Sequence, residues 1–205
     1  MKKIIISALI GIGIMLTGCS TIKVNEDKPV VADIYIVHSK LKSYETFPDS
    51  RRRIWNEGAT IDDVIESFPE GSNPTIIHKT TATTQWDKLV EIKETNFLNA
   101  DSWDIKNKEW LNKVTDANPV ITSLFKFKMT PKHLEDGRNV ALMTYTLEFL
   151  REVAKAENKE LYYTNTDLFK DAKEVQFLTD RYYVFGALSL KNKESLILIY
   201  KLTND

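Results

Sequence analysis

The chain has 205 residues, 42% hydrophobic and 28% charged, a balance that predicts one globular domain behind a short leader. Its 28 basic and 29 acidic residues give a net charge of −1, and without Lys2 and Lys3 the remaining 26 basic residues give −3. Because there is no basic excess, we expect no nucleic-acid partner. The single cysteine, Cys19, excludes an intramolecular disulfide framework and a cysteine-rich zinc site.

The first segment, residues 1–18, has the layout of an export signal. Lys2 and Lys3 form a basic start, an apolar stretch follows, and Leu16-Thr17-Gly18-Cys19 comes directly after it. These four residues resemble the lipobox of bacterial lipoproteins. The resemblance implies cleavage between Gly18 and Cys19, with a covalent diacylglycerol and an N-acyl lipid on Cys19. No other cofactor is expected. The alternative is an uncleaved anchor helix, for which the segment is shorter than the usual span of about 20 apolar residues.

Ser20, the residue after the cysteine, bears on the destination of the protein. By resemblance to the sorting rule of Gram-negative lipoproteins, a serine at this place implies the periplasmic face of the outer membrane. In a Gram-positive cell the same anchor would place the domain on the outer face of the plasma membrane. Residues 19–29 are polar and lack periodicity, which predicts a lipidated tether, so the folded domain is expected to span residues 30–205.

The beginning of the domain predicts a strand, a loop and a helix. Residues 30–37 are rich in β-branched and aromatic side chains, as strands are. Residues 40–58 include three consecutive arginines and are interpreted as a solvated loop. The sequence TIDD at 60–63 fits a helix-capping signature, and apolar residues recur at helical spacing over 61–68. A short amphipathic helix is therefore predicted there, ended by Pro69.

The remainder predicts a mainly β domain with one or two short helices (α+β) and a mostly antiparallel sheet. Turn signals at 135–137 and 191–194 separate segments of alternating apolar and polar residues. Phe125, Phe127 and Met129 alternate with lysines, which places one strand face on a core. Residues 99–118 predict a short helix or an ordered loop. The predicted strands are 75–84, 88–97, 123–130, 138–150, 174–179, 182–190 and 195–202.

The sequence contains no recognisable set of catalytic residues, so no enzymatic activity is expected. His38, His78 and His133 lie far apart and lack metal-ligand spacing, which favours structural roles. Phosphate-binding and nucleophile motifs are missing as well. Trp103 and Trp110 would contact a partner or a lipid interface, or would complete a core, as large aromatic side chains usually do.

The order of the segments resembles the β-domain of secretins, the outer-membrane ring proteins of type II and type III secretion and of type IV pili. The matching blocks are a strand, a short helix, a threonine-rich strand, an apolar strand ending at Pro131, a turn at Gly137, a long strand, and a final pair whose first member contains Gly186. The resemblance implies a truncated secretin-like domain. Ala187 stands where the family has a second glycine, and only four residues connect Leu190 to Ser195.

Two hypotheses of function follow. The leading one is a structural or accessory lipoprotein of a secretion or pilus apparatus, which pairs its sheet edges with copies of itself or with a secretin. Strands 125–130 and 140–149 are predicted to supply that interface. The alternative is a monomeric periplasmic or surface lipoprotein that binds or inhibits a target through loops 40–58 and 99–118. The predicted interface residues are Phe125, Phe127, Met129, Pro131, Gly137, Trp103 and Trp110.

Overall fold

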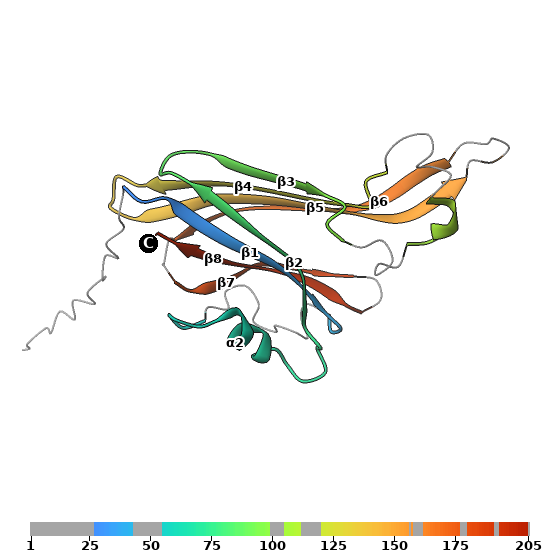
Figure 1. The fold of residues 1–205 in the computed structure, drawn as a ribbon, viewed down its shortest axis with the longest axis horizontal. Coiled ribbons are helices and arrows are strands. Elements are labelled where there is room, and N and C mark those ends of the chain that lie inside the picture. The colour runs from blue at the N-terminus through green and yellow to red at the C-terminus, as the bar shows by residue number, and fades with distance from the viewer. Residues whose placement is uncertain are drawn as a thin grey trace, which may run out of the picture.

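A computed structural model describes residues 27–42, 55–98, 105–111, 120–155, 157, 162–176, 180–190 and 193–204. The described chain forms two four-stranded antiparallel sheets packed face to face (Figure 1). Sheet A has the strand order β2-β1-β8-β7, and sheet B has the order β3-β4-β5-β6. The predicted mainly β, antiparallel fold is thus confirmed. The strand bounds are β1 Val30–Ser39, β2 Thr75–Thr84, β3 Val90–Thr95, β4 Ser123–His133, β5 Asn139–Lys155, β6 Tyr162–Gln176, β7 Tyr182–Ser189 and β8 Ser195–Thr203.

The strands follow one another around the sandwich in chain order. β1 pairs with β2, the chain then crosses to β3 in sheet B, continues through β4, β5 and β6, and returns to β7 and β8 in sheet A. β8 finally pairs antiparallel with β1, from Val31 opposite Thr203 to Ser39 opposite Ser195. The circuit is therefore hydrogen-bonded everywhere except at two seams between the sheets, one at β2/β3 and one at β6/β7.

The core lies between the inner faces of the two sheets. Alternate side chains of β1, β4, β5 and β8 point inward, as the two-residue period of a strand requires, and they are almost completely buried. Burying apolar side chains of this size contributes about 1.5–3 kcal/mol each. The largest fully buried side chains are Phe125, Phe127, Phe149, Phe185, Ile34, Ile36, Met129, Met143, Leu147 and Leu150.

Helix α2, Ile61–Glu66, covers the outer face of sheet A (Figure 1). The predicted capping box is present: the Asp63 N–H donates to Thr60 Oγ1 at 3.2 Å, and the Thr60 N–H donates to Asp63 Oδ2 at 2.7 Å. The helix ends two residues before the predicted end, because Ser67 forms its C-cap. Phe68 is nevertheless buried against sheet A, as the helical spacing required.

The β4–β5 hairpin confirms the predicted turn at Gly137 and corrects the place of Pro131. Gly137 has φ +81, and the Leu134 N–H donates to the Arg138 carbonyl at 2.8 Å. Pro131 is predicted to end the first strand of this hairpin, but it lies inside β4, opposite Ala141, and the strand continues to His133. Its carbonyl accepts from the Asp87 N–H at 2.8 Å, so its nitrogen also faces away from β5. The missing N–H therefore removes no hydrogen bond from the β4–β5 ladder.

Strands β5 and β6 are longer than predicted and project beyond the rest of the sandwich (Figure 1). β5 was expected to end at Leu150, but a bulge between Leu150 and Glu152 lets it continue to Lys155. Of β6, only 174–179 had been predicted; the strand begins at Tyr162, and residues 177–179 lie outside the described part. The β6 sequence has no clear apolar face, and most of its described side chains are exposed.

Candidate functional site

The fold buries the three apolar side chains predicted to lie at an interface. Phe125, Phe127 and Met129 are at most 1% exposed and pack between the sheets. Their strand, β4, is flanked by β3 and β5, and β5 is flanked by β4 and β6. The two strands predicted to supply an interface are therefore interior strands whose backbones are already paired on both sides, which corrects that prediction. An edge contact of sheet B has to involve β3 or β6.

Of the other predicted site residues, Pro131 and Gly137 belong to the β4–β5 hairpin, Trp110 packs against a small core cluster, and the rest lie outside the described residues. Trp110 belongs to a 3-10 turn, η3 (Lys108–Trp110), and packs partly buried against Leu150 and Val153 near the projecting hairpin. This contact matches the core-completing role considered for it. Trp103, Gly18 and Cys19 lie outside the described residues, so the lipidation site stays a prediction. Within the described ranges, none of the helices has the length and apolarity needed to cross a membrane.

The three histidines occupy separate places, each with its own neighbours. His38 Nε2 lies 2.8 Å from Glu194 Oε2, and His78 Nε2 lies 2.7 Å from Glu94 Oε2. His133 stacks on Trp86 with ring centroids 4.1 Å apart. Among the described residues no three histidine, cysteine, aspartate or glutamate side chains gather as metal ligands would.

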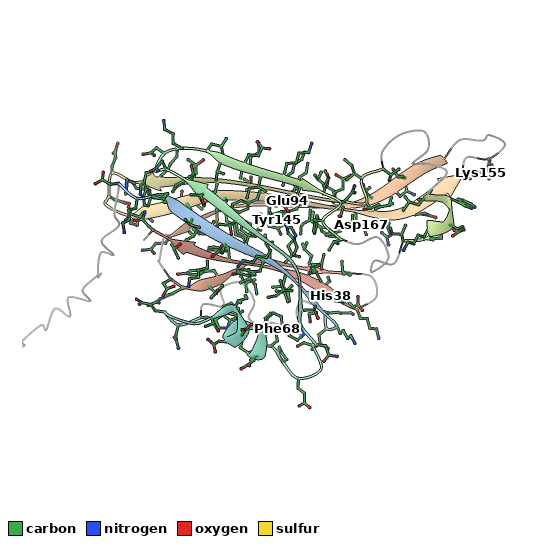
Figure 2. The ribbon with its side chains drawn as sticks, in the orientation of Figure 1. His38, Phe68, Glu94, Tyr145, Lys155 and Asp167 are labelled. Carbon is green, nitrogen blue, oxygen red and sulfur yellow. The ribbon has the colours of Figure 1, made fainter. Side chains whose placement is uncertain are left out.

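A carboxylate joins the two sheets at the β2/β3 seam. Glu94 of β3 accepts a hydrogen bond from Thr80 Oγ1 at 2.6 Å and lies beside His78, both residues of β2 (Figure 2 labels Glu94). The His78 ring also packs against Phe97 and Phe125. Burial lowers the pKa of His78, and the Glu94 carboxylate partly opposes that shift. The seam is thus closed by polar side chains where no backbone ladder closes it.

The β6/β7 seam is closed by a lysine. Lys173 of β6 donates a hydrogen bond to the Phe185 carbonyl of β7, and its ammonium also lies 3.3 Å from Asp171 Oδ2. Beneath this contact, Tyr145 of β5 lies so close to β7 that a Cβ on Gly186 would be 2.7 Å from the tyrosine oxygen. Burial, with a smaller contribution from Asp171, raises the pKa of Tyr145 to about 12. Gly186 is required by this close approach.

Comparison with protein families and with curated proteins gives no guide to the function. No protein-family model matches the chain, and no curated protein matches it. The candidate site is therefore inferred from the edges that the sandwich leaves open. β2 and β3 have 10 and 6 residues, and β7 has 8, whereas β6 has 15. Because long unpaired edges are templates for pairing with another chain, β6 is the strongest candidate for an interaction site.

Strand β6 presents both backbone and side chains to the outside. No described strand pairs with its outer edge, since its ladder partner is β5 alone. Leu168 is 51% exposed, and the Ala172 N–H donates to Asp171 Oδ1 of its own strand at 2.9 Å. The composition of this segment favours a strand, although its apolar and polar residues do not alternate. Tyr162, Tyr163, Thr164 and Thr166 favour strands, and no glycine or proline interrupts the segment.

An open groove lies beside β6 on the outer face of sheet B. It has a volume of about 380 Å³ and runs from Leu89, the residue before β3, across β4 and β5 to β6. Its apolar side chains, Leu89 and Leu142, are 62% and 38% exposed. Lys128 and Glu174 supply charge at its border. The groove is shallow because it lies on a sheet surface, and it adds apolar area next to the β6 edge.

Proposed function

We propose that this protein is a non-enzymatic, membrane-anchored lipoprotein that acts as a structural or accessory component of a secretion or pilus apparatus. The observation that carries the proposal is the long β6 edge, whose outer side pairs with no described strand. Adding a strand to such an edge is a common way for proteins to bind one another, since the backbone supplies the hydrogen bonds. The action proposed for the domain is therefore contact, not catalysis.

The anchor proposed for the protein is a lipid on Cys19, and it supports the same function. β1 begins at Val30, so residues 19–29 would join the lipid to the sandwich. An extended segment of that length spans at most about 40 Å. The domain would then work close to the membrane surface, on the periplasmic face of an outer membrane or on the outer face of a Gram-positive plasma membrane.

We further propose that the domain is secretin-like. This proposal is supported by the order of the sequence blocks, from the first strand and helix to the final strand pair. The same order occurs in the fold as β1, α2, β2 and β3, then the β4–β5 hairpin and the β7–β8 hairpin. The gating segment of secretins has no counterpart between Leu190 and Ser195. We therefore propose an accessory or structural role for the domain instead of a complete gated pore.

Lipidation is tested by replacing Cys19. The wild-type protein should incorporate a labelled fatty acid and fractionate with membranes, whereas Cys19→Ala should carry no label because it has no thiol. The folded domain should be unaffected, since Cys19 precedes β1. Label that persists in the Cys19→Ala protein would exclude this anchor.

The assembly role is tested by placing a photo-crosslinking residue at Leu168, on β6, in the full-length protein in cells. A matched probe at Lys93, an exposed residue of the other edge strand of sheet B, serves as the control. We expect Leu168 to give a discrete adduct containing a secretin-type subunit or this protein itself. If Leu168 gives no adduct beyond the Lys93 background, β6 is not an assembly surface and the proposal fails.

A further inference from the structure

Four charged residues of β6 flank Ala172, and residues at equal distances on its two sides carry opposite charges. Lys170 and Asp171 precede it, and Lys173 and Glu174 follow it. If two β6 strands lie antiparallel with Ala172 opposite its own copy, each residue faces the one equally far from Ala172 on the other side. Lys170 then faces Glu174, and Asp171 faces Lys173. Every charged pair formed by these four residues is of opposite sign, which stabilises a cross-strand contact.

The backbone of β6 fits this register. The Ala172 N–H donates to the side chain of Asp171, so it points away from β5 and toward the open edge. The N–H and C=O groups of every second residue point to the same side of a strand, which places those of Lys170 and Glu174 at the open edge too. Residues with outward groups form the hydrogen-bonded pairs of an antiparallel ladder. Both Ala172–Ala172 and Lys170–Glu174 are pairs of this kind.

The symmetric registers with the axis two residues away are less favourable. Moving the two-fold axis by two residues places Lys170 opposite Lys170 or Glu174 opposite Glu174, and like charges directly opposite each other destabilise a strand pair. The axis at Ala172 also puts a small side chain at the centre of the contact. It pairs Phe169 with Val175, two residues that pack partly buried against the core.

We propose that the partner of β6 is a second copy of this chain, paired antiparallel about a two-fold axis at Ala172. The two copies form one continuous eight-stranded sheet, in which each β6 is an interior strand. The Ala172 N–H exchanges its bond to Asp171 for a carbonyl of the other copy, and Asp171 gains Lys173 of that copy as a neighbour. This inference rests on the proposed function, because it specifies the partner of the same edge.

Cysteine crosslinking tests the register. In the full-length Cys19→Ala protein, an introduced cysteine is the sole thiol. Ala172→Cys places two cysteines opposite each other, with Cα atoms about 5.5 Å apart, within the range of a disulfide. Leu168→Cys is the control, because its two copies would be eight positions apart along the ladder, or about 27 Å. In detergent under mild oxidation, we expect a covalent dimer from Ala172→Cys and only background from Leu168→Cys.

Charge exchange tests the pairing without a crosslink. Lys170→Glu puts a second carboxylate opposite Glu174 at two places in the dimer, so the dissociation constant measured by sedimentation should rise about tenfold or more. Glu174→Lys should have the same effect, and the double variant should restore dimerisation because the opposite charges are re-created in exchanged positions. Lys93→Glu on β3 is the matched control and should leave the dimer unchanged.

The outcomes separate this inference from the proposed function. Equal crosslinking at positions 172 and 168, or a double variant that stays as weak as the single variants, overturns self-pairing at Ala172. In that case an adduct between Leu168 and another envelope protein would still support the assembly role. Loss of fatty-acid labelling is a third, independent readout, since it depends on Cys19 and not on β6.

Discussion

Strands β5 and β6 lie side by side and pair along nearly their whole length, yet their surroundings differ completely. β5 is an interior strand whose inward side chains fill the core, whereas most described side chains of β6 are exposed. Leu147 and Leu168 show the difference, since they are 1% and 51% exposed. The comparison teaches that a strand at a sheet edge is held by its neighbour's backbone. The exposed side chains of such a strand, such as Leu168 on β6, are then available for binding.

The sharpest test of this contrast is truncation of a leucine on β5. Leu147→Ala removes a fully buried side chain and leaves a cavity, so the free energy of unfolding should fall by about 2–5 kcal/mol. Urea denaturation followed by tyrosine and tryptophan fluorescence measures the loss. A fall of less than about 1 kcal/mol would show that the inner face of β5 is not rigidly packed.

A second test concerns the close approach of β5 to β7. Gly186→Ala places a methyl group 2.7 Å from the Tyr145 oxygen, so we expect a loss of about 1–3 kcal/mol in the free energy of unfolding. Tyr145→Phe removes that oxygen, and the next atom of the ring, Cζ, is 3.5 Å away, an ordinary contact. In the Tyr145→Phe background, Gly186→Ala should therefore be nearly neutral. Additive losses in the double variant would contradict this contact.

At the β2/β3 seam, His78 is expected to make the stability of the protein depend on pH. Because burial lowers the pKa of His78 in the folded protein, the unfolded chain binds a proton at this residue first as the pH falls. The contribution of neutral His78 to the free energy of unfolding is fully present above about pH 6.5, the pKa of an unfolded histidine. It is lost as the pH falls through that value toward the lower pKa of the folded protein. His78→Gln should flatten the stability profile in this range. If wild type and variant lose stability in parallel, the seam histidine is not the cause.

The smallest effect is expected on β6. Leu168→Ala removes the same atoms as Leu147→Ala, but from a half-exposed position, so the free energy of unfolding should change by no more than about 0.5 kcal/mol. The measurement is the same urea titration, made with dilute protein so that association does not contribute. A loss comparable to that of Leu147→Ala would mean that β6 is covered in solution.

The parts of the fold that the sequence predicted are those where one strand face is buried. β2 has the predicted bounds, β1 begins at the predicted residue, and Phe125, Phe127 and Met129 form the predicted core face. Alternation is visible in such segments because burial demands it. β6 faces water on most of its length, so its sequence lacked that signal, and the bulge after Leu150 hid the end of β5 by changing the phase.

The seams and the candidate site were harder to predict for another reason. Glu94 meets His78 and Lys173 meets Phe185 only because distant strands are brought together, and no local pattern encodes such pairs. The charges around Ala172 were plain in the sequence. Only the structure shows that these charges lie on an open strand edge. Pro131 is the reverse case, because a residue typical of turns lies inside a strand.

The pairing of β1 with β8 has a consequence for the timing of folding. The two central strands of sheet A are separated by almost the whole described chain, so the first strand synthesised must await the last one. Contacts of such large sequence separation require a long loop to close and make folding slow. A chain released before β8 is complete would leave β1 with β2 as its only ladder partner and would expose the apolar faces of both sheets. Such a fragment should aggregate instead of forming half a sandwich.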